Sequence, residues 1–312
     1  MPDQPLAIGI DFGGTSVKIG VVRHDDVIDH APPIATQEFE GPERLLEAIT
    51  RTIEDLRRRH PGIIAAGVGM PGFVDFQTGV VRGLTNVIGW NQFPLKDRLQ
   101  ALIGLPVTVD NDANCMAYAE WKQGAGRGFQ HLVAITLGTG VGGGIVANGQ
   151  MIRGARFGAG EVGQMSIDWQ GIRGTYGNLG ALEEYIGNQE ITQLAHKRYQ
   201  QDELHRSPAE CTPAHLSKNA AAGDPIAIEL WDGIAARLAT ALMNCCWLLN
   251  PDALIIGGGM AKAGEILFTP LRRHLFEQLS PPFTEALQIL PARFGNEAGM
   301  IGAAALAIEA TA

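Results

Sequence analysis

The sequence predicts an α/β protein with two domains around a cleft. Its 312 residues exceed the usual size of one hydrophobic core, and about 150 residues per domain makes two domains the first expectation. A pattern of strand, glycine turn and strand occurs at residues 6–22 and again at 132–147, at an offset of about 125 residues, which indicates an internal duplication. Glycines also gather behind apolar segments, where the backbone can approach a ligand.

The first half alternates strands and helices. Residues 6–22 have apolar residues on both sides of a Gly-Gly-Thr turn, which predicts a hairpin of two buried strands. A helix is expected over 42–59, with proline at its first position and apolar residues at helical spacing. Strands follow at 63–68 and 106–110, and the second brings Asn111-Asp112 to its carboxyl end, a common place for ligand contacts.

The second half repeats this order. After the hairpin at 132–147 we expect helices within 181–201 and over 224–249, a strand at 253–256, and a final helix at 298–310. The polar segment 202–219 is interpreted as a surface loop, because its two histidines have no clustered cysteine or carboxylate to form a metal site. The predicted domains are residues 1–112 with the C-terminal helix 297–312, and residues 113–296.

Composition excludes several classes of protein. A formal net charge of −9 and a pI near 5.4 argue against a nucleic-acid partner, which requires an excess of lysine and arginine. We find no apolar stretch long enough to span a membrane and no signal peptide. The four cysteines lack the spacing of a disulfide framework or a CxxC site. A cytoplasmic location is therefore expected, without nucleic-acid or membrane partners.

Two turns are candidate phosphate sites. Asp11 stands at a strand end before Gly13-Gly14-Thr15, a turn whose amides could hold phosphate oxygens while the carboxylate binds Mg²⁺ directly or through water. The second turn, Gly138-Thr139-Gly140, has amides and a hydroxyl but no carboxylate. Either turn alone is better explained as an ordinary hairpin, but their recurrence favours a nucleotide. Neither turn matches a Walker or dinucleotide-binding motif.

Asp112 is a candidate general base. Because Asp112 stands at the start of a predicted helix, one alternative is that it simply caps the helix N-terminus and has no catalytic role. Asn86, Glu161, Gln164 and Glu183 lie in segments near glycines and suit the binding of sugar hydroxyls, and a hydroxyl that attacks phosphorus needs an acceptor for its proton. The presence of these polar residues favours a catalytic role for Asp112.

Five segments together resemble the ROK family of bacterial glucokinases, N-acetylhexosamine kinases and repressors. They are Ile10-Asp-Phe-Gly-Gly-Thr-Ser-Val-Lys18, Val109-Asp-Asn-Asp-Ala-Asn114, Leu137-Gly-Thr-Gly-Val-Gly-Gly-Gly144, Gly160-Glu-Val-Gly-Gln164 and Ile255-Ile-Gly-Gly-Gly259. They occur in the family's order over nearly the whole chain. The resemblance implies an actin-like ATPase fold with two RNase H-like domains, and an ATP-dependent hexose kinase that uses Mg²⁺.

The resemblance also implies roles for individual residues. Those expected to contact the nucleotide or its metal are Asp11, Gly13, Gly14, Thr15, Lys18, Thr139, Gly140, Gly257, Gly258 and Gly259. Those expected to contact the sugar are Gly72, Asn86, Asn111, Asp112, Glu161, Gln164 and Glu183. Asp112 would be the general base and Asp11 the metal-side carboxylate. The expected partners are a hexose, a nucleotide and a second copy of the chain as a homodimer.

One departure concerns zinc. Typical members hold zinc with a histidine after Gly-Glu-Ile-Gly and with three cysteines in a CxCGxxGCxE run. The four corresponding residues here are Gln164, Gly174, Tyr176 and Ala181. None of them is a zinc ligand of the usual type, so no zinc is expected.

Three alternative functions are compared with that of a glucokinase. A sugar-responsive repressor would carry an additional helix-turn-helix before the first strand, whereas this sequence reaches that strand by residue 6. A sugar-binding protein without activity is disfavoured because Asp112 and both turns are intact. Among kinases, an N-acetylmannosamine or N-acetylglucosamine kinase is the alternative to a glucokinase.

Overall fold

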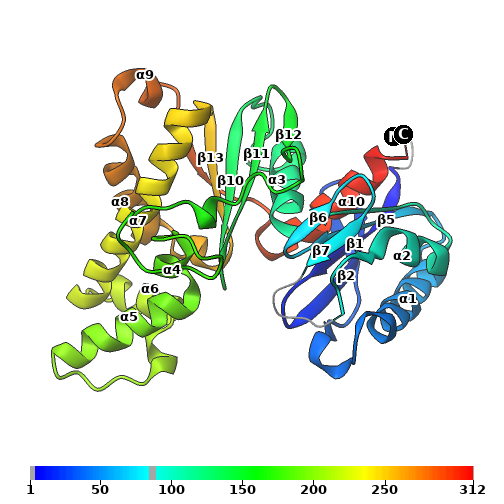
Figure 1. Ribbon diagram of the computed structural model, residues 1–312, viewed down its shortest axis with the longest axis horizontal. Coiled ribbons are helices and arrows are strands. Elements are labelled where there is room, and N and C mark those ends of the chain that lie inside the picture. The colour runs from blue at the N-terminus through cyan, green and yellow to red at the C-terminus, as the bar shows by residue number, and fades with distance from the viewer. Residues whose placement is uncertain (1–3, 84–88, 312) are drawn as a thin grey trace. The chain divides into compact units, whose positions relative to one another are not determined.

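The chain folds into two compact units, seen here in a computed structural model that describes residues 4–83 and 89–311 (Figure 1). The first unit comprises residues up to Gly128, then Met151–Gly160, and finally the residues from Arg293 onward. The second unit comprises Phe129–Gln150 and Glu161–Ala292. The expected boundary at 112/113 would divide the units before the helix that follows residue 111. By its contacts, that helix groups with the first unit.

A mixed sheet forms the centre of the first unit. Its strands are β1 (Leu6–Phe12), β2 (Ser16–Arg23), β3 (Asp26–His30), β4 (Ile34–Ala35), β5 (Ile63–Met70) and β9 (Val107–Asn111). The order is β3-β2-β1-β5-β9, with β4 paired to β2. Strands β1, β5 and β9 run parallel, so their carboxyl ends lie along one edge. A small sheet of β6 (Phe73–Asp75), β7 (Val80–Gly83) and β8 (Phe93–Pro94) follows β5.

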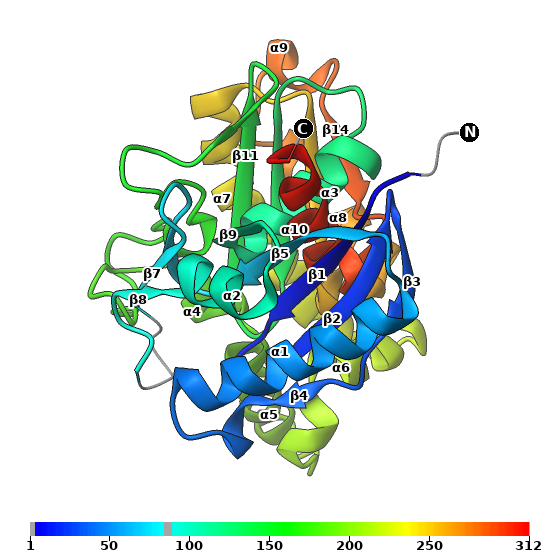
Figure 2. The same cartoon turned by 90° about the vertical axis from the view of Figure 1, so that its right-hand side faces the viewer.

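Helices cover both faces of this sheet. They are α1 (Pro42–Arg59), α2 (Leu95–Ile103), α3 (Asp112–Gln123) and α10 (Ala298–Glu309). Because side chains alternate along a strand, Ile8 and Ile10 of β1 join the core beneath α1 and α2, whereas Ala7 faces α10. Figure 2 shows α1 lying across β1 and β2.

The C-terminal helix α10 packs unusually closely on the first unit. A Cβ atom on Gly67 of β5 would overlap the carbonyl group of Ala303, and one on Gly302 of α10 would overlap the carbonyl group of Cys115 in α3. These glycines therefore let α10 approach both the sheet and α3 at backbone distance. Residues at the end of the sequence thus complete the core built by the beginning of the sequence.

The second unit has its own sheet. Its order is β12-β11-β10-β13-β14, with β12 (Gln150–Ile152) at the point where the chain returns to the first unit. The other strands are β10 (Leu132–Leu137), β11 (Val141–Ala147), β13 (Ala253–Gly257) and β14 (Gln288–Pro291). The helices are α4 (Glu183–Ile186), α5 (Asn188–Gln201), α6 (Pro213–Ala221), α7 (Pro225–Leu249), α8 (Glu265–Phe276) and α9 (Pro281–Thr284). Strands β10, β13 and β14 are parallel.

The two sheets share one strand order, which agrees with the internal duplication that the repeated pattern indicated. In each, an antiparallel three-stranded meander is followed by two strands parallel to its first strand. β1 therefore corresponds to β10, and β5 corresponds to β13. Each glycine turn joins the first two strands of its sheet, so the two candidate phosphate turns occupy equivalent places.

The segment 202–219 differs from the prediction of a loop. It contains a 3-10 turn at Pro208–Cys211 and most of helix α6, whose first turn is capped by the Thr212 side chain. Leu216 and Ala220 of α6 are buried, as is Cys211 in the turn before it, so a few apolar residues among polar ones suffice to hold this segment on the core. Within the described ranges, every helix is too short or too polar to cross a lipid bilayer.

Candidate active site

Three parallel strands bring the predicted residues of the first unit to one edge. In the register of the sheet, Asp11 is opposite Gly69 of β5, and Gly69 is opposite Asp110 of β9. Asn111 and Asp112 follow at the end of β9 and the start of α3. The edge formed by the carboxyl ends of parallel strands is the usual ligand-binding edge of an α/β sheet.

Asn111, and not Asp112, caps helix α3. The Asn111 side-chain oxygen accepts hydrogen bonds from the amides of Ala113 at 2.9 Å and Asn114 at 3.1 Å. The side-chain nitrogen of Asn111, Nδ2, donates to the carbonyl of Gly72 at 3.1 Å, which fixes the turn between β5 and β6. The interpretation of Asp112 as a mere N-cap is therefore wrong, because its neighbour fills that position.

The environment of Asp112 makes it a weaker acid than usual. Burial is the main cause, and it raises the pKa of Asp112 to about 6. The negative charge of Asp11 also raises this pKa. A hydrogen bond from the Ala113 amide favours the charged carboxylate and so acts in the opposite direction. Gly69 lies beside this corner, since a Cβ there would be 3.5 Å from the Asp112 Cα and 3.3 Å from the Cys115 sulfur. A carboxylate with a pKa near neutrality is suited to accept a proton.

Asp11 and its turn form the other part of this edge. The Gly13 amide donates to the Ser16 carbonyl at 2.9 Å and closes the hairpin. The Lys18 ammonium lies 3.3 Å from an Asp11 carboxylate oxygen, so Lys18 and Asp11 stand together beside the turn. A partly exposed carboxylate oxygen is the type of ligand that Mg²⁺ prefers, and Asp11 supplies one such carboxylate here.

In the second unit, Glu183 supports the corresponding turn. Its carboxylate accepts from the Val141 amide at 2.8 Å and from the Gln164 side-chain amide at 3.3 Å. A Cβ on Gly140 would overlap the same carboxylate, so a side chain at this position would displace the Glu183 carboxylate from its present place. Glu183 and Gln164, both expected near the sugar, are thus joined to each other and to the turn that contains Thr139.

The glycine run after β13 lies beside this turn. Gly257 pairs with Thr136 of β10, and Gly258 has a φ of 83° with its α-carbon against the Leu137 backbone, where a side chain would overlap. Gly259 begins the following 3-10 turn. Because β10 and β13 are parallel, this glycine run and the turn that contains Thr139, both expected to contact the nucleotide, share one sheet edge.

The remaining predicted sugar contacts are placed as follows. Glu161 precedes the short 3-10 turn Val162–Gln164, which packs on β11 through Gly163. Gly72 has a φ of 79° and follows β5. Asn86 lies outside the described residues.

The four positions that correspond to the family's zinc ligands lie in and next to a hairpin closed by hydrogen bonds. Gly174 and Ala181 are close enough that a Cβ on the first would lie 3.3 Å from that of the second. The Glu184 carboxylate accepts from the Thr175 amide at 2.9 Å, and the Asn178 side chain donates to the Gln164 carbonyl at 2.8 Å. Across residues 4–83 and 89–311, no group of three or more His, Cys, Asp or Glu residues is arranged to hold a metal ion.

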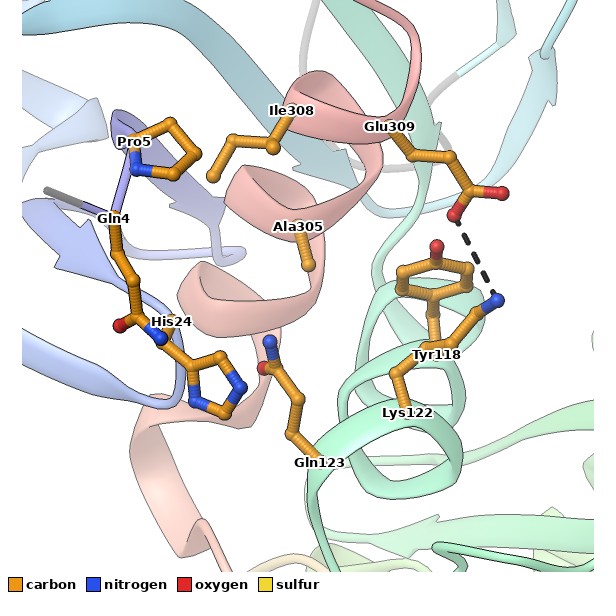
Figure 3. Close-up of a pocket in the computed structure, with 9 residues that line it drawn as sticks. All are labelled: Gln4, Pro5, His24, Tyr118, Lys122, Gln123, Ala305, Ile308 and Glu309. Carbon is orange, nitrogen blue, oxygen red and sulfur yellow. Dashed lines mark ion pairs between the residues drawn. The ribbon is translucent and has the colours of Figure 1, made fainter. Parts of the chain in front are cut away.

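A separate pocket of about 320 Å³ lies between α3, α10 and the start of β1. Figure 3 shows Gln4 and His24 approaching α10 from one side, and Tyr118 and Lys122 from the other. None of the predicted nucleotide or sugar residues lines it. The pocket is therefore distinct from the sheet edge that contains Asp112.

Sequence reasoning missed Asp110 and Arg153. Asp110 is 2% exposed and forms an ion pair with Arg153, with 2.7 Å between the Arg153 Nη2 and a carboxylate oxygen. A charged residue inside an otherwise apolar strand requires a buried partner, which is the signal that the sequence offered. The identity of that partner, 43 residues later, was not evident from any spacing.

Comparison with known proteins gives a match over almost the entire chain. The sequence model of the ROK family matches residues 7–310. A glucokinase from Halalkalibacterium halodurans is 35% identical over 306 residues, which cover 95% of this chain and 92% of that protein. A glucokinase from Thermotoga maritima is 33% identical over 315 residues, 99% of each chain.

A solved structure agrees in fold. The crystal structure of a ROK family glucokinase from Streptomyces griseus in complex with glucose and AMPPNP superposes with a TM-score of 0.84 and 31% sequence identity. The match covers 97% of this chain and 99% of that one. The predicted actin-like ATPase fold is thereby confirmed.

Proposed function

The chain belongs to the ROK family, and from this premise we propose that it is an ATP-dependent hexose kinase that phosphorylates the 6-hydroxyl of glucose or a close relative, with Asp112 as general base. The observation that carries the proposal is that Asn111, and not Asp112, caps α3, which leaves the Asp112 carboxylate available for another role. Asn111 satisfies the helix amides, while Asp112 stands at the ligand-binding edge with a pKa raised to about 6.

In this reaction the sugar hydroxyl attacks the terminal phosphorus of ATP. Asp112 takes the hydroxyl proton as the new oxygen–phosphorus bond forms and the bond to the bridging oxygen of ADP breaks. The amides of Gly13-Gly14-Thr15 and of the turn around Thr139 are proposed to bind phosphate oxygens. Bound Mg²⁺ would neutralise phosphate charge, and Asp11 would hold it directly or through water.

The substrate test is an ADP-release assay over a panel of sugars. We expect turnover with glucose or a close C6 relative and ATP. Higher kcat/KM for N-acetylmannosamine or N-acetylglucosamine would replace the glucokinase proposal with the N-acetylhexosamine kinase alternative. ATP is compared with polyphosphate in the same assay, and preference for polyphosphate would overturn the donor assignment. Turnover of no sugar with either donor would refute the kinase proposal.

The pH dependence of kcat/KM should reflect the protonation of Asp112. The base acts in its deprotonated form, and its pKa is raised to about 6, so kcat/KM for the sugar should fall as the pH drops below about 6. A carboxylate with an ordinary pKa would keep full activity about two pH units lower. A pH profile of kcat/KM measured with saturating MgATP tests this, and an acid limb near pH 4 would contradict the assigned environment.

We also expect the enzyme to contain no stoichiometric zinc. The hairpin that contains Gly174 is closed by backbone and side-chain hydrogen bonds, among them those of Asn178 and Glu184, which can hold it without a metal. Treatment with EDTA followed by Mg²⁺ should therefore restore full activity and leave the melting temperature unchanged. One tightly bound zinc per chain in elemental analysis would show that other ligands exist.

A further inference from the structure

Asp110 is a buried carboxylate whose two oxygens are both occupied. One oxygen accepts from the Asn111 amide at 2.8 Å and from the Asn114 side-chain amide at 3.1 Å. The other accepts from two nitrogens of Arg153, Nε at 2.9 Å and Nη2 at 2.7 Å. Asp110 therefore contacts residues on both sides of Asp112 and one residue distant in sequence.

Arg153 is itself held in place. Its guanidinium carbon lies 3.7 Å from the centre of the Phe76 ring, and its side chain is 16% exposed. It belongs to Met151–Gly160, the short segment that groups with the first unit although the residues on either side of it belong to the second. A planar guanidinium that stacks on a ring and bonds a carboxylate has little freedom to move.

This arrangement fixes the turn that carries the proposed base. Without Arg153, the Asp110 carboxylate would be buried with only two amide donors, and burial of an uncompensated charge favours rearrangement. Any shift of Asp110 would be passed to Asn111 and Asn114 through their hydrogen bonds. Asp112, between them, would move with the turn.

We propose that Arg153 is a positioning residue for phosphoryl transfer, which acts through Asp110 to hold Asp112 in line with the hydroxyl that it deprotonates. The inference rests on the proposed function of Asp112. It goes beyond that proposal by assigning a role to a residue that does not contact the reacting groups.

The first test is Arg153→Met. We expect kcat to fall roughly 10-fold or more with the KM for the sugar changed less than about 3-fold, because misplacement of a catalytic group affects the chemical step more than binding. Arg153→Lys keeps the charge but not the planar pair of donors, so its kcat should lie between those of the methionine variant and the wild type.

A double variant separates positioning from stability. Asp110→Asn combined with Arg153→Met leaves no unpaired buried charge, so its melting temperature should recover toward that of the wild type. Its kcat should remain low, because the link between residue 153 and the turn is still absent. Recovery of kcat together with the melting temperature would show a structural role only and overturn the inference.

Arg206→Met is the matched control. Arg206 lies over the Tyr199 ring at 4.2 Å and bonds Asp224, the cap of α7, at 3.0 Å, so like Arg153 it combines a ring contact with a carboxylate contact, in the second unit. This variant should lower the melting temperature without lowering kcat. An equal loss of kcat in both variants would also overturn the inference.

The outcomes also separate this inference from the proposed function. If the wild type phosphorylates a hexose and Asp112→Asn abolishes turnover while Arg153→Met is fully active, only the positioning role fails. If the wild type phosphorylates no hexose, the proposed function fails, and the positioning role in that reaction fails with it. If Arg153→Met does not fold, Arg153→Lys and the double variant decide between the outcomes above.

Discussion

Asp112→Asn is expected to lower kcat by at least ~10² while sugar binding stays largely intact. Asparagine has nearly the same shape and can still accept from the Ala113 amide, but it cannot take the proton of the attacking hydroxyl. Steady-state kinetics and a binding titration with the sugar alone measure the two effects separately.

Asp224→Asn makes the same chemical change at a capping aspartate. Asp224 accepts from the amides of Ile226 and Ala227, and asparagine is an equally good cap, so this control should keep kcat. Its melting temperature should fall somewhat, because asparagine cannot form the ion pair with Arg206. If Asp112→Asn also turned over at a near-normal rate, the assignment of the base would have to be abandoned.

Gly302→Ala is expected to destabilise the protein by about 2–3 kcal/mol. Alanine in a helix is ordinarily more stabilising than glycine by about 1 kcal/mol, so the sign is opposite to the propensity. The reason is that a Cβ at this position of α10 would overlap the carbonyl oxygen of Cys115 in α3, and backbone cannot yield as a side chain does. Denaturant unfolding followed by circular dichroism measures the change.

Gly233→Ala in α7 is the matched control. A Cβ there would meet only the end of the Arg237 side chain, at 3.1 Å, which can move away. The control should therefore be neutral or gain up to about 1 kcal/mol. A gain at Gly302 as well would mean that α10 does not approach α3 as closely as described.

Local patterns predicted most of the elements. The helix expected over 42–59 spans Pro42–Arg59, since proline at its first position and a regular apolar face leave little choice of boundaries. The repeat of a glycine turn between apolar strands likewise indicated an internal duplication, and the two sheets do share one strand order. Helix α6 was missed because only Leu216 and Ala220 of its residues are buried, too few to give a clear period.

The sequence predicted which residues belong to the candidate site better than it predicted their hydrogen-bond partners. Asn111-Asp112 could be located from the sequence, but not which of the two would cap α3, because both residue types are good caps. Nor did the sequence reveal that Glu183 bonds the Val141 amide, since the two are 42 residues apart. Pairings of this kind depend on the folded chain, and residue spacing does not encode them.

The close packing of α10 has a consequence for synthesis on the ribosome. The first unit includes residues near the start of the sequence, yet its core also includes Met300, Ile301 and Ala304, which are translated after the whole of the second unit. The second unit ends at Ala292, so its complete sequence emerges earlier. Domains usually fold from the N-terminus during translation. Here that order would be reversed: the downstream unit can reach its native state while the upstream one waits, with the α10 side of its sheet uncovered, until the final helix emerges.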